Sequence, residues 1–210
     1  MRRLLRVMAV FAASLPMPAK ADDQISLSFY GGTAKHEMQG AGPHFSLLGD
    51  QRGMTLEWER VPSDPLAPRF GLRVDHADHA PLSTATSPRR WQRNLGHRLI
   101  ARNDSLTVTA AMPLHRSDRG ELALRAGLGL ARSHVHVTTA QASGHASATL
   151  PRAELALRQT LNAPDGGPAF WGELGYHTSP ALSVALSDGT TIRLETSGFR
   201  LAIGISIPLQ

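Results

Sequence analysis

Apolar and polar residues alternate along most of the chain after residue 22. A period of two is typical of β-strands that have one apolar and one polar face. Residues 120–131 show it clearly, with Leu122, Leu124, Leu128 and Leu130 on one face and Glu121 and Arg125 on the other. The same pattern predicts eight strands, at residues 25–30, 54–60, 69–75, 106–110, 120–131, 152–158, 169–177 and 198–209.

The connections between these strands alternate in length. Three are short and rich in turn residues: "VPSDPLAP" after the second strand, "HRSDR" after the fourth and "NAPDGG" after the sixth. The other four are longer and cover residues 32–51, 77–103, 133–147 and 178–194. A membrane barrel has this arrangement, with tight turns on one side and surface loops on the other. We therefore expect an all-β fold, an eight-stranded antiparallel up-and-down transmembrane β-barrel.

The last long connection continues the alternation, at Leu182, Val184 and Leu186. These residues share parity with Leu174, so we expect the seventh strand to continue past Pro180 with the same face outward. Asp188-Gly189 predicts a tight hairpin turn. On the return, the apolar positions change from even to odd numbers, which predicts a β-bulge around residues 196–198.

Alternation alone does not say which face meets water, because a soluble barrel such as a lipocalin also alternates. The polar faces carry both signs of charge on adjacent strands, together with small residues that suit a narrow interior. A charge facing the middle of a bilayer would cost about 2–4 kcal/mol, and the apolar faces are almost free of charge. We therefore expect an internal charge network of Glu57, Glu59, Arg73, Asp75, Glu121, Arg125, Glu154, Arg158, Glu173 and Arg200.

The first 21 residues differ from the rest of the chain. They combine a basic start, the short apolar run "VMAVFAASLPM" and the small-x-small end "AKA", which predicts a cleaved signal peptide followed by one barrel domain at 22–210. The formal net charge is +5, but four of the cations lie in this leader, so the mature chain would carry about +1 and we expect no nucleic acid partner. The chain has no cysteine, which excludes disulfides as a source of stability.

The leader, the eight strands and the closing "TSGFRLAIGISIPLQ" together resemble the small Gram-negative outer-membrane β-barrels of the OmpA/OmpX type. The resemblance covers residues 22–210 and implies a location in the cell outer membrane. It implies a non-enzymatic monomer whose partners are outer-membrane lipid, lipopolysaccharide and the barrel-insertion machinery, and whose exposed loops contact lipopolysaccharide, a host surface or envelope proteins. An eight-stranded barrel is only wide enough for side chains, so we expect no continuous pore. A soluble periplasmic lipocalin-like carrier is an alternative that requires the charged face outside.

A second alternative is an enzyme. The segment "GYHTSPALS" resembles the outer-membrane lipid A deacylases, in which a histidine base and a serine nucleophile are oriented by a glutamate. Carried over to this sequence, the resemblance implies catalytic roles for His177, Ser179 and Glu195. Two features depart from that family: Pro180 follows the serine where the family has asparagine, and His177 and Ser179 share parity with the charged face.

Histidines and arginines near the strand ends are further candidates for binding. "DHADH" at 75–79 and "HVH" at 134–136 have spacings that metal ligands use, but no closed ligand set can be counted, so we expect solvated loop histidines and no metal. "RRWQR" at 89–93 suits contact with lipopolysaccharide phosphates, or is a plain solvated loop. The sequence has no Gly-rich phosphate loop, nucleophile elbow or dinucleotide fingerprint, so we expect no cofactor.

Overall fold

A computed structural model of the chain describes residues 21–39, 45–64, 66–81, 98–138, 141–162 and 167–209. The expected signal peptide lies outside the described residues except for Ala21, and so does most of the expected 77–103 loop, including residues 89–93. Among the described residues, no helix is long and apolar enough to cross a membrane.

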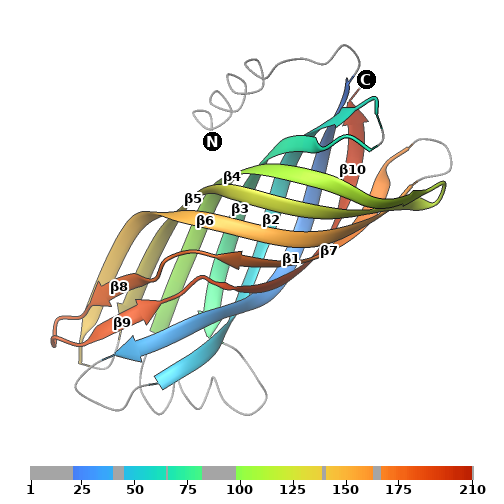
Figure 1. Cartoon of the computed structure of the whole chain (residues 1–210). Coiled ribbons are helices and arrows are strands. Elements are labelled where there is room, and N and C mark those ends of the chain that lie inside the picture. Colours follow the sequence, from blue (N-terminus) through green and yellow to red (C-terminus); the bar gives the residue numbers. More distant parts are fainter. Residues whose placement is uncertain are drawn as a thin grey trace.

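The described residues form β-strands joined in one sheet (Figure 1). In chain order the strands are β1 (Ala21–Gln39), β2 (Phe45–Pro62), β3 (Arg69–Pro81), β4 (Arg98–Ser117), β5 (Gly120–Thr138), β6 (Ser143–Leu161), β7 (Ala169–Thr178), β8 (Leu182–Ala185), β9 (Thr191–Leu194) and β10 (Gly198–Leu209). Strands β1 to β7 pair in order, β7 pairs with β10, and β10 pairs with β1, which closes a ring. All pairings are antiparallel, so the predicted eight-stranded antiparallel ring is confirmed.

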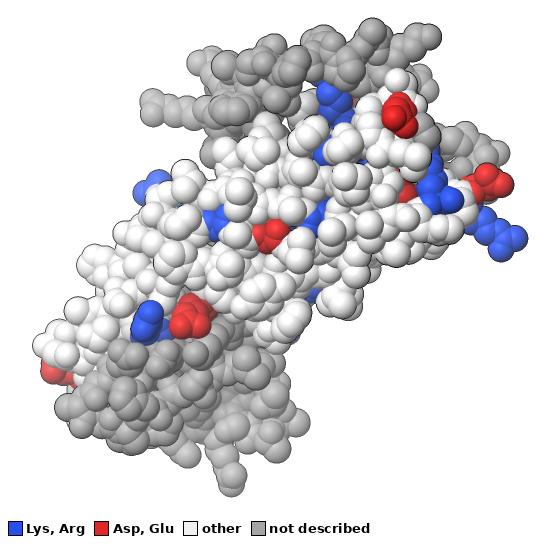
Figure 2. Space-filling model, viewed as in Figure 1, with Lys and Arg blue, Asp and Glu red and all other residues white. Residues whose placement is uncertain are grey.

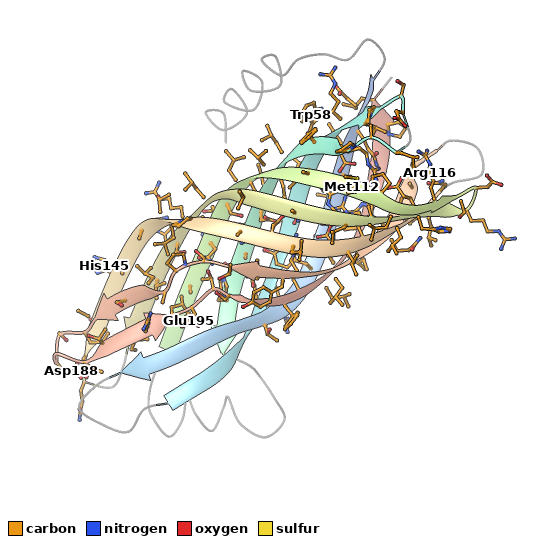
Figure 3. All side chains as sticks on the ribbon, viewed as in Figure 1. Trp58, Met112, Arg116, His145, Asp188 and Glu195 are labelled. Carbon is orange, nitrogen blue, oxygen red and sulfur yellow. The ribbon has the colours of Figure 1, made fainter. Side chains whose placement is uncertain are left out.

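Apolar side chains cover the outside of the ring and charged side chains fill the inside. On β5, Leu124, Leu128 and Leu130 are 37%, 72% and 57% exposed, whereas Glu121 and Arg125 are 7% and 3% exposed. The same alternation runs along the neighbouring strands, whose outward side chains project from the ribbon in Figure 3. The barrel is therefore inverted relative to a soluble one, because its apolar faces point outward.

The two ends of the barrel differ. At one end, which we call the turn end, short connections join β2 to β3, β4 to β5 and β6 to β7, and β1 begins and β10 ends there. At the opposite end, the loop end, the strands extend further than the alternation predicted: β5 runs to Thr138 and β6 begins at Ser143. The expected long connection at 133–147 is therefore wrong, because Val135 and Val137 continue the inward face of a strand.

The segment after β7 changes which parity faces inward. Ser179 and Leu182 are both buried, and Val184 and Leu186 are buried as well. The prediction that Leu182, Val184 and Leu186 continue the outward apolar face is therefore wrong. The change falls at residues 180–181, between β7 and β8, where Pro180 has no N–H to donate to a ladder.

The return from the hairpin keeps one parity throughout. Ile192, Leu194, Thr196 and Arg200 are all buried, so β9 and β10 present the same even-numbered face to the interior. The predicted β-bulge around 196–198 is wrong, because no slip of the inward face occurs there. The inward residues change from apolar before Thr196 to polar from Thr196 onward. The apolar positions therefore appear to change parity in the sequence, although the inward face does not.

The barrel wall is not continuously hydrogen-bonded at the loop end. β9 pairs with β1 through residues such as Met38 and Ile192, and β8 pairs with β9, but no ladder among the described residues joins β8 to β6. This β6–β8 seam is bridged at its far end, where Ser187 N donates to Ser143 O at 3.2 Å. At its near end Ser179 Oγ donates to Pro151 O at 2.8 Å.

Two layers fill the interior. A charged layer occupies the ring from the turn end to the level of His177, and an apolar layer, which we call the apolar cap, lies at the loop end. The apolar cap consists of Ala101, Val135, Val137, Ala142, Leu182, Val184, Leu186, Ile192 and Leu194. It packs the inner side of the β8–β9 hairpin against β4, β5 and β6, and so holds the seam closed by side-chain contact.

Candidate functional site

Buried ionic side chains are concentrated inside the ring. Six carboxylates and six guanidinium groups take part in ion pairs there: Glu57, Glu59, Asp75, Glu121, Glu154 and Glu173, with Arg69, Arg73, Arg125, Arg152, Arg158 and Arg200. All ten residues expected on the inward face from the sequence lie in this set. The six negative and six positive formal charges cancel, so these groups give the interior no net formal charge.

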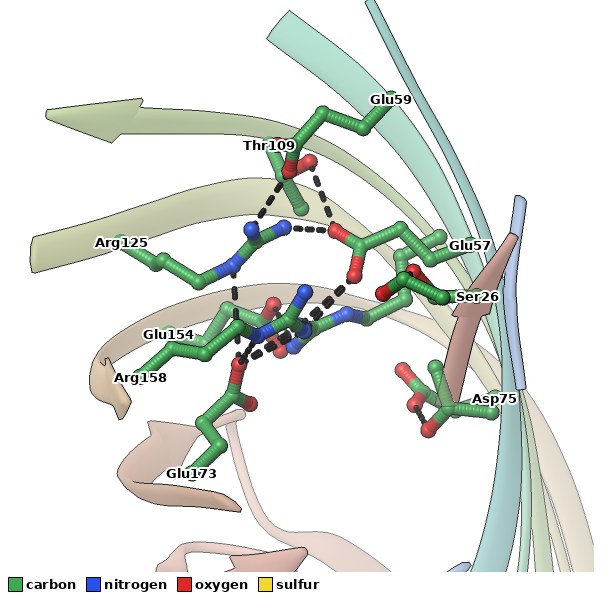
Figure 4. A network of polar contacts seen from close by, with 12 residues as sticks. Ser26, Glu57, Glu59, Asp75, Thr109, Arg125, Glu154, Arg158 and Glu173 are labelled. Carbon is green, nitrogen blue, oxygen red and sulfur yellow. Dashed lines mark hydrogen bonds and ion pairs between the residues drawn. The ribbon is translucent and has the colours of Figure 1, made fainter. Parts of the chain in front are cut away.

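Glu57 and Glu173 are the centres of the network (Figure 4). Glu57 accepts hydrogen bonds from Arg125 Nη2, from Arg158 Nη2 at 2.8 Å and from Thr109 Oγ1 at 3.2 Å. Glu173 accepts hydrogen bonds from Arg158 Nε at 2.9 Å and, on its other oxygen, from Arg200 Nη2 at 2.8 Å. The two glutamates lie on β2 and β7, so the network ties opposite sides of the ring together.

Arg73 crosses the interior between these centres. Its Nη1 donates to Glu154 Oε1 at 2.7 Å, and its Nη2 donates to Glu173 Oε2 at 3.1 Å. A buried ion is stable only when opposite charges and hydrogen bonds replace its water, and each of these groups has several such partners. The space for this crossing is provided in part by Gly127, where a Cβ would lie 2.7 Å from Glu154 Cγ.

A second group of polar contacts surrounds Asp75 on β3. Its carboxylate accepts hydrogen bonds from Thr55 Oγ1 at 2.5 Å and from Ser105 Oγ at 3.1 Å. Arg200 Nη1 and Arg152 Nη2 lie 3.6 and 3.8 Å from the Asp75 oxygens. The group links three adjacent strands with β6 and β10, and so continues the network toward the loop end.

Arg69 also belongs to the network, although it is not among the ten residues expected from the sequence. Its guanidinium pairs with Glu121 and lies 3.4 Å from Glu59. The sequence carried the signal, since Arg69 shares parity with Arg73 and Asp75, but it is the first residue of its strand. Arg69, Glu59 and Glu121 line a cavity of about 140 Å³ at the turn end.

Aromatic side chains pack beside the charged groups inside the barrel. The Arg158 guanidinium carbon lies 3.8 Å from the Trp171 ring centroid, and that of Arg200 lies 5.6 Å from the Tyr30 ring centroid. Such stacking covers the faces of the guanidinium groups, whose edges donate to carboxylates. Together with the apolar cap, these side chains occupy much of the described interior, and the cavity beside Arg69 lies at the turn end.

The candidate catalytic residues do not form a reactive group. His177 lies on the inward face and is fully buried, opposite Glu154 and Gly198 in the strand register. The Ser179 hydroxyl donates to the Pro151 carbonyl, and no hydrogen bond among the described residues joins it to His177. Glu195 lies beyond β9, next to inward-facing Thr196 and on the opposite parity (Figure 3).

The candidate metal ligands divide between two faces. In the 75–79 segment, Asp75 and His79 are buried inside, whereas Asp78 is exposed and His76 Nδ1 lies 2.6 Å from Asp104 Oδ1 on the outer face. Residues 134 and 136 are exposed. Among the described residues, no group of three or more histidine, aspartate or glutamate side chains is placed to hold a metal ion.

An eight-stranded antiparallel ring with an apolar exterior and a charged, filled interior has the fold of the small outer-membrane β-barrels. Solved structures agree. The chain matches Neisserial surface protein A with a TM-score of 0.52 and 11% identity over 90% of this chain and 98% of that one. It matches a major outer membrane protein from Thermus thermophilus with a TM-score of 0.58 and 12% identity, over 89% of this chain and 99% of that one. No family model and no curated protein matches the sequence.

Proposed function

We propose that the chain is a non-enzymatic outer-membrane barrel protein, which crosses the bilayer with its eight-stranded ring and presents its loop end outside the cell. The observation that carries this proposal is the reversed polarity of the barrel. Large apolar side chains such as Leu128, Leu174 and Ile203 stand exposed on its outer surface, while Arg73 and Glu57 are buried. In water this arrangement would expose apolar surface around the whole barrel, whereas in lipid it places each face in its preferred medium.

The space-filling view supports the same assignment. Most of the described surface in Figure 2 is uncharged, with charged side chains toward its two ends and a few visible between them. Tyr176 and Phe199 meet edge to face with ring centroids 5.1 Å apart, on the outer surface of the wall toward the loop end. Aromatic side chains at such a level are typical of membrane interfaces.

The filled interior supports an anchoring role rather than transport. Opposite charges from six strands pair across the lumen, and the apolar cap lies between them and the loop end. A solute would have to break buried ion pairs and displace Val184 and Leu194 to pass. The exposed loops at the loop end then make the contacts of the protein, with lipopolysaccharide, a host surface or envelope proteins as partners.

The structure gives no support to either alternative function. A soluble lipocalin-like carrier requires the charged faces outside, and these faces are inside, so the burial pattern contradicts this alternative. A deacylase requires a serine that a lipid can reach, whereas the Ser179 hydroxyl is buried and bonded to Pro151 O, so no observation favours that function.

Fractionation of cells that express the full chain tests the proposal. We expect the protein in the detergent-extracted outer-membrane fraction, with a gel mobility that changes when the sample is boiled, because closed barrels resist unfolding by detergent at room temperature. Recovery in the soluble periplasm without a change of mobility on boiling would contradict it.

A further inference from the structure

The outer face of β5 and β6 at the loop end carries an arginine, three histidines and no carboxylates. We define this basic strip as Arg132, His134 and His136 on β5 with His145 on β6. All four side chains are exposed, and His136 lies directly opposite His145 in the strand register. The other outward positions of these two segments, from residues 132–138 and 143–151, hold Thr138, Ser143, Ser147, Thr149 and Pro151.

The neighbouring strands β3 and β4 carry acidic and basic side chains at the same level, and these contact one another. Arg102 Nε lies 3.2 Å from Asp78 Oδ1, and His76 Nδ1 lies 2.6 Å from Asp104 Oδ1. Asp104 is opposite Arg132 in the register, yet its carboxylate bonds His76 instead. Arg132 makes no ion pair with any residue that the structure describes, so its charge is available to a ligand.

The position of the strip along β5 indicates what that ligand is. Leu128 and Leu130 precede Arg132 on the same outward face and are among the more exposed leucines of the barrel. The surface therefore changes within a few residues from apolar to basic. A molecule that fits both parts has hydrocarbon chains joined to an anionic head.

We propose that the basic strip binds the phosphate groups of an outer-leaflet glycolipid, whose acyl chains lie against Leu128 and Leu130. The inference rests on the proposed function, because only a barrel in a membrane meets such a lipid at this level. The Arg132 guanidinium donates two parallel hydrogen bonds to phosphate oxygens, and the imidazole N–H groups of His134, His136 and His145 donate further ones. The Ser147 and Thr149 hydroxyls lie beside them as additional donors.

Refolded full-length protein in detergent micelles tests this site with two forms of one lipid. The probes are bisphosphorylated lipid A and the same lipid A after its phosphates are removed. The strip variant replaces Arg132, His134, His136 and His145 by glutamine. The control variant, Asp78→Asn with Arg102→Gln, removes an exposed ion pair from the adjacent strands without changing the net charge.

We expect the wild type and the control variant to bind the phosphorylated lipid about tenfold more tightly than the dephosphorylated one, as lost charge-assisted hydrogen bonds imply. The strip variant should bind both forms alike. A strip variant that keeps the preference, or a wild type without one, would overturn the site. Inorganic pyrophosphate that binds as tightly as lipid A would overturn the lipid as the ligand.

Folding of each variant is measured independently of lipid binding. The gel mobility of each protein before and after boiling reports whether a closed barrel has formed, so a failure of the proposed function appears there and not in the lipid preference. If the fourfold variant does not fold, Arg132→Gln and His145→Gln replace it as single variants, and each should lose part of the preference.

Discussion

Arg73 on β3 and Glu154 on β6 meet inside the barrel, with 2.7 Å between Nη1 and Oε1, although 81 residues separate them in the sequence. Both side chains are buried, and Arg73 also reaches Glu173 on β7. The contact spans the interior and joins strands that do not pair with one another. It therefore reports on closure of the ring as well as on the charge network.

Removing one partner of this contact should destabilise the barrel strongly. Glu154→Leu leaves the guanidinium of Arg73 short of a hydrogen-bonded carboxylate inside the barrel, and we expect a loss of about 3–5 kcal/mol in the free energy of unfolding. Unfolding in urea, followed by gel mobility in unboiled samples, measures it. The control is Asp78→Asn, which breaks the exposed pair with Arg102 and should cost about 0–1 kcal/mol. Equal losses from the two variants would contradict a buried network.

Space inside the ring should be limiting at Gly127. A Cβ there would lie 2.7 Å from both Glu154 Cγ and Thr107 Cγ2, so Gly127→Ala should destabilise the barrel by about 1–3 kcal/mol through overpacking. Gly31→Ala is the matched control, because no atom lies within 4 Å of a Cβ at that position. The same urea titration compares the two variants. A Gly127 variant as stable as the control would show that the interior has room for a methyl group at this position.

A charged side chain on the outer wall should destabilise the barrel at the level of Leu128 but not nearer the loop end. Leu128→Arg places a guanidinium on the lipid-facing surface and should cost about 2–4 kcal/mol, with little folded protein in the membrane. His134→Arg lies farther along the same outward face of β5 and should cost about 0–1 kcal/mol. The amount of folded protein in the outer-membrane fraction measures both. Equal yields would mean that this face does not contact lipid.

The β6–β8 seam should be the weakest part of the wall. Amides on the edges of β6 and β8 that face each other lack ladder partners among the described residues, so they should exchange hydrogen faster than the amides of Val135 and Val137. A disulfide between Ser143→Cys and Ser187→Cys joins residues already in contact across the seam and should slow that exchange. Uniform exchange rates in the reduced protein would contradict an open edge.

Much of the ring could be predicted from the sequence, because the interior and the exterior of a narrow barrel differ in chemistry at every second residue. The strands at 120–131 and 198–209 follow this rule. The rule fails at the loop end, where the interior becomes apolar and the outward residues become polar. Leu182 and Val184 are apolar because they pack into the apolar cap, and parity counted from Leu174 assigns them to the outside.

The partners within the interior could not be predicted. Parity places Arg73, Glu154 and Glu173 on the inward face, but the contacts among them depend on the stagger and closure of the strands. The pattern also underestimates strand length, for a related reason. His134 and His136 on the outside of β5 are polar like the loop that follows them, so in the sequence the strand ends before its inward valines.

Spin labels on the outer wall report directly whether lipid or water surrounds Leu128. The natural sequence has no cysteine, so Leu128→Cys and His136→Cys each accept a single nitroxide label in protein reconstituted into lipid vesicles. Relaxation of the label by oxygen, which enters bilayers, is compared with relaxation by a water-soluble nickel chelate. If the outer wall contacts lipid, oxygen should act strongly and nickel weakly on the label at position 128, and the reverse should hold at position 136. A label at position 128 that responds mainly to nickel would show that the apolar face meets water, and would contradict the membrane barrel.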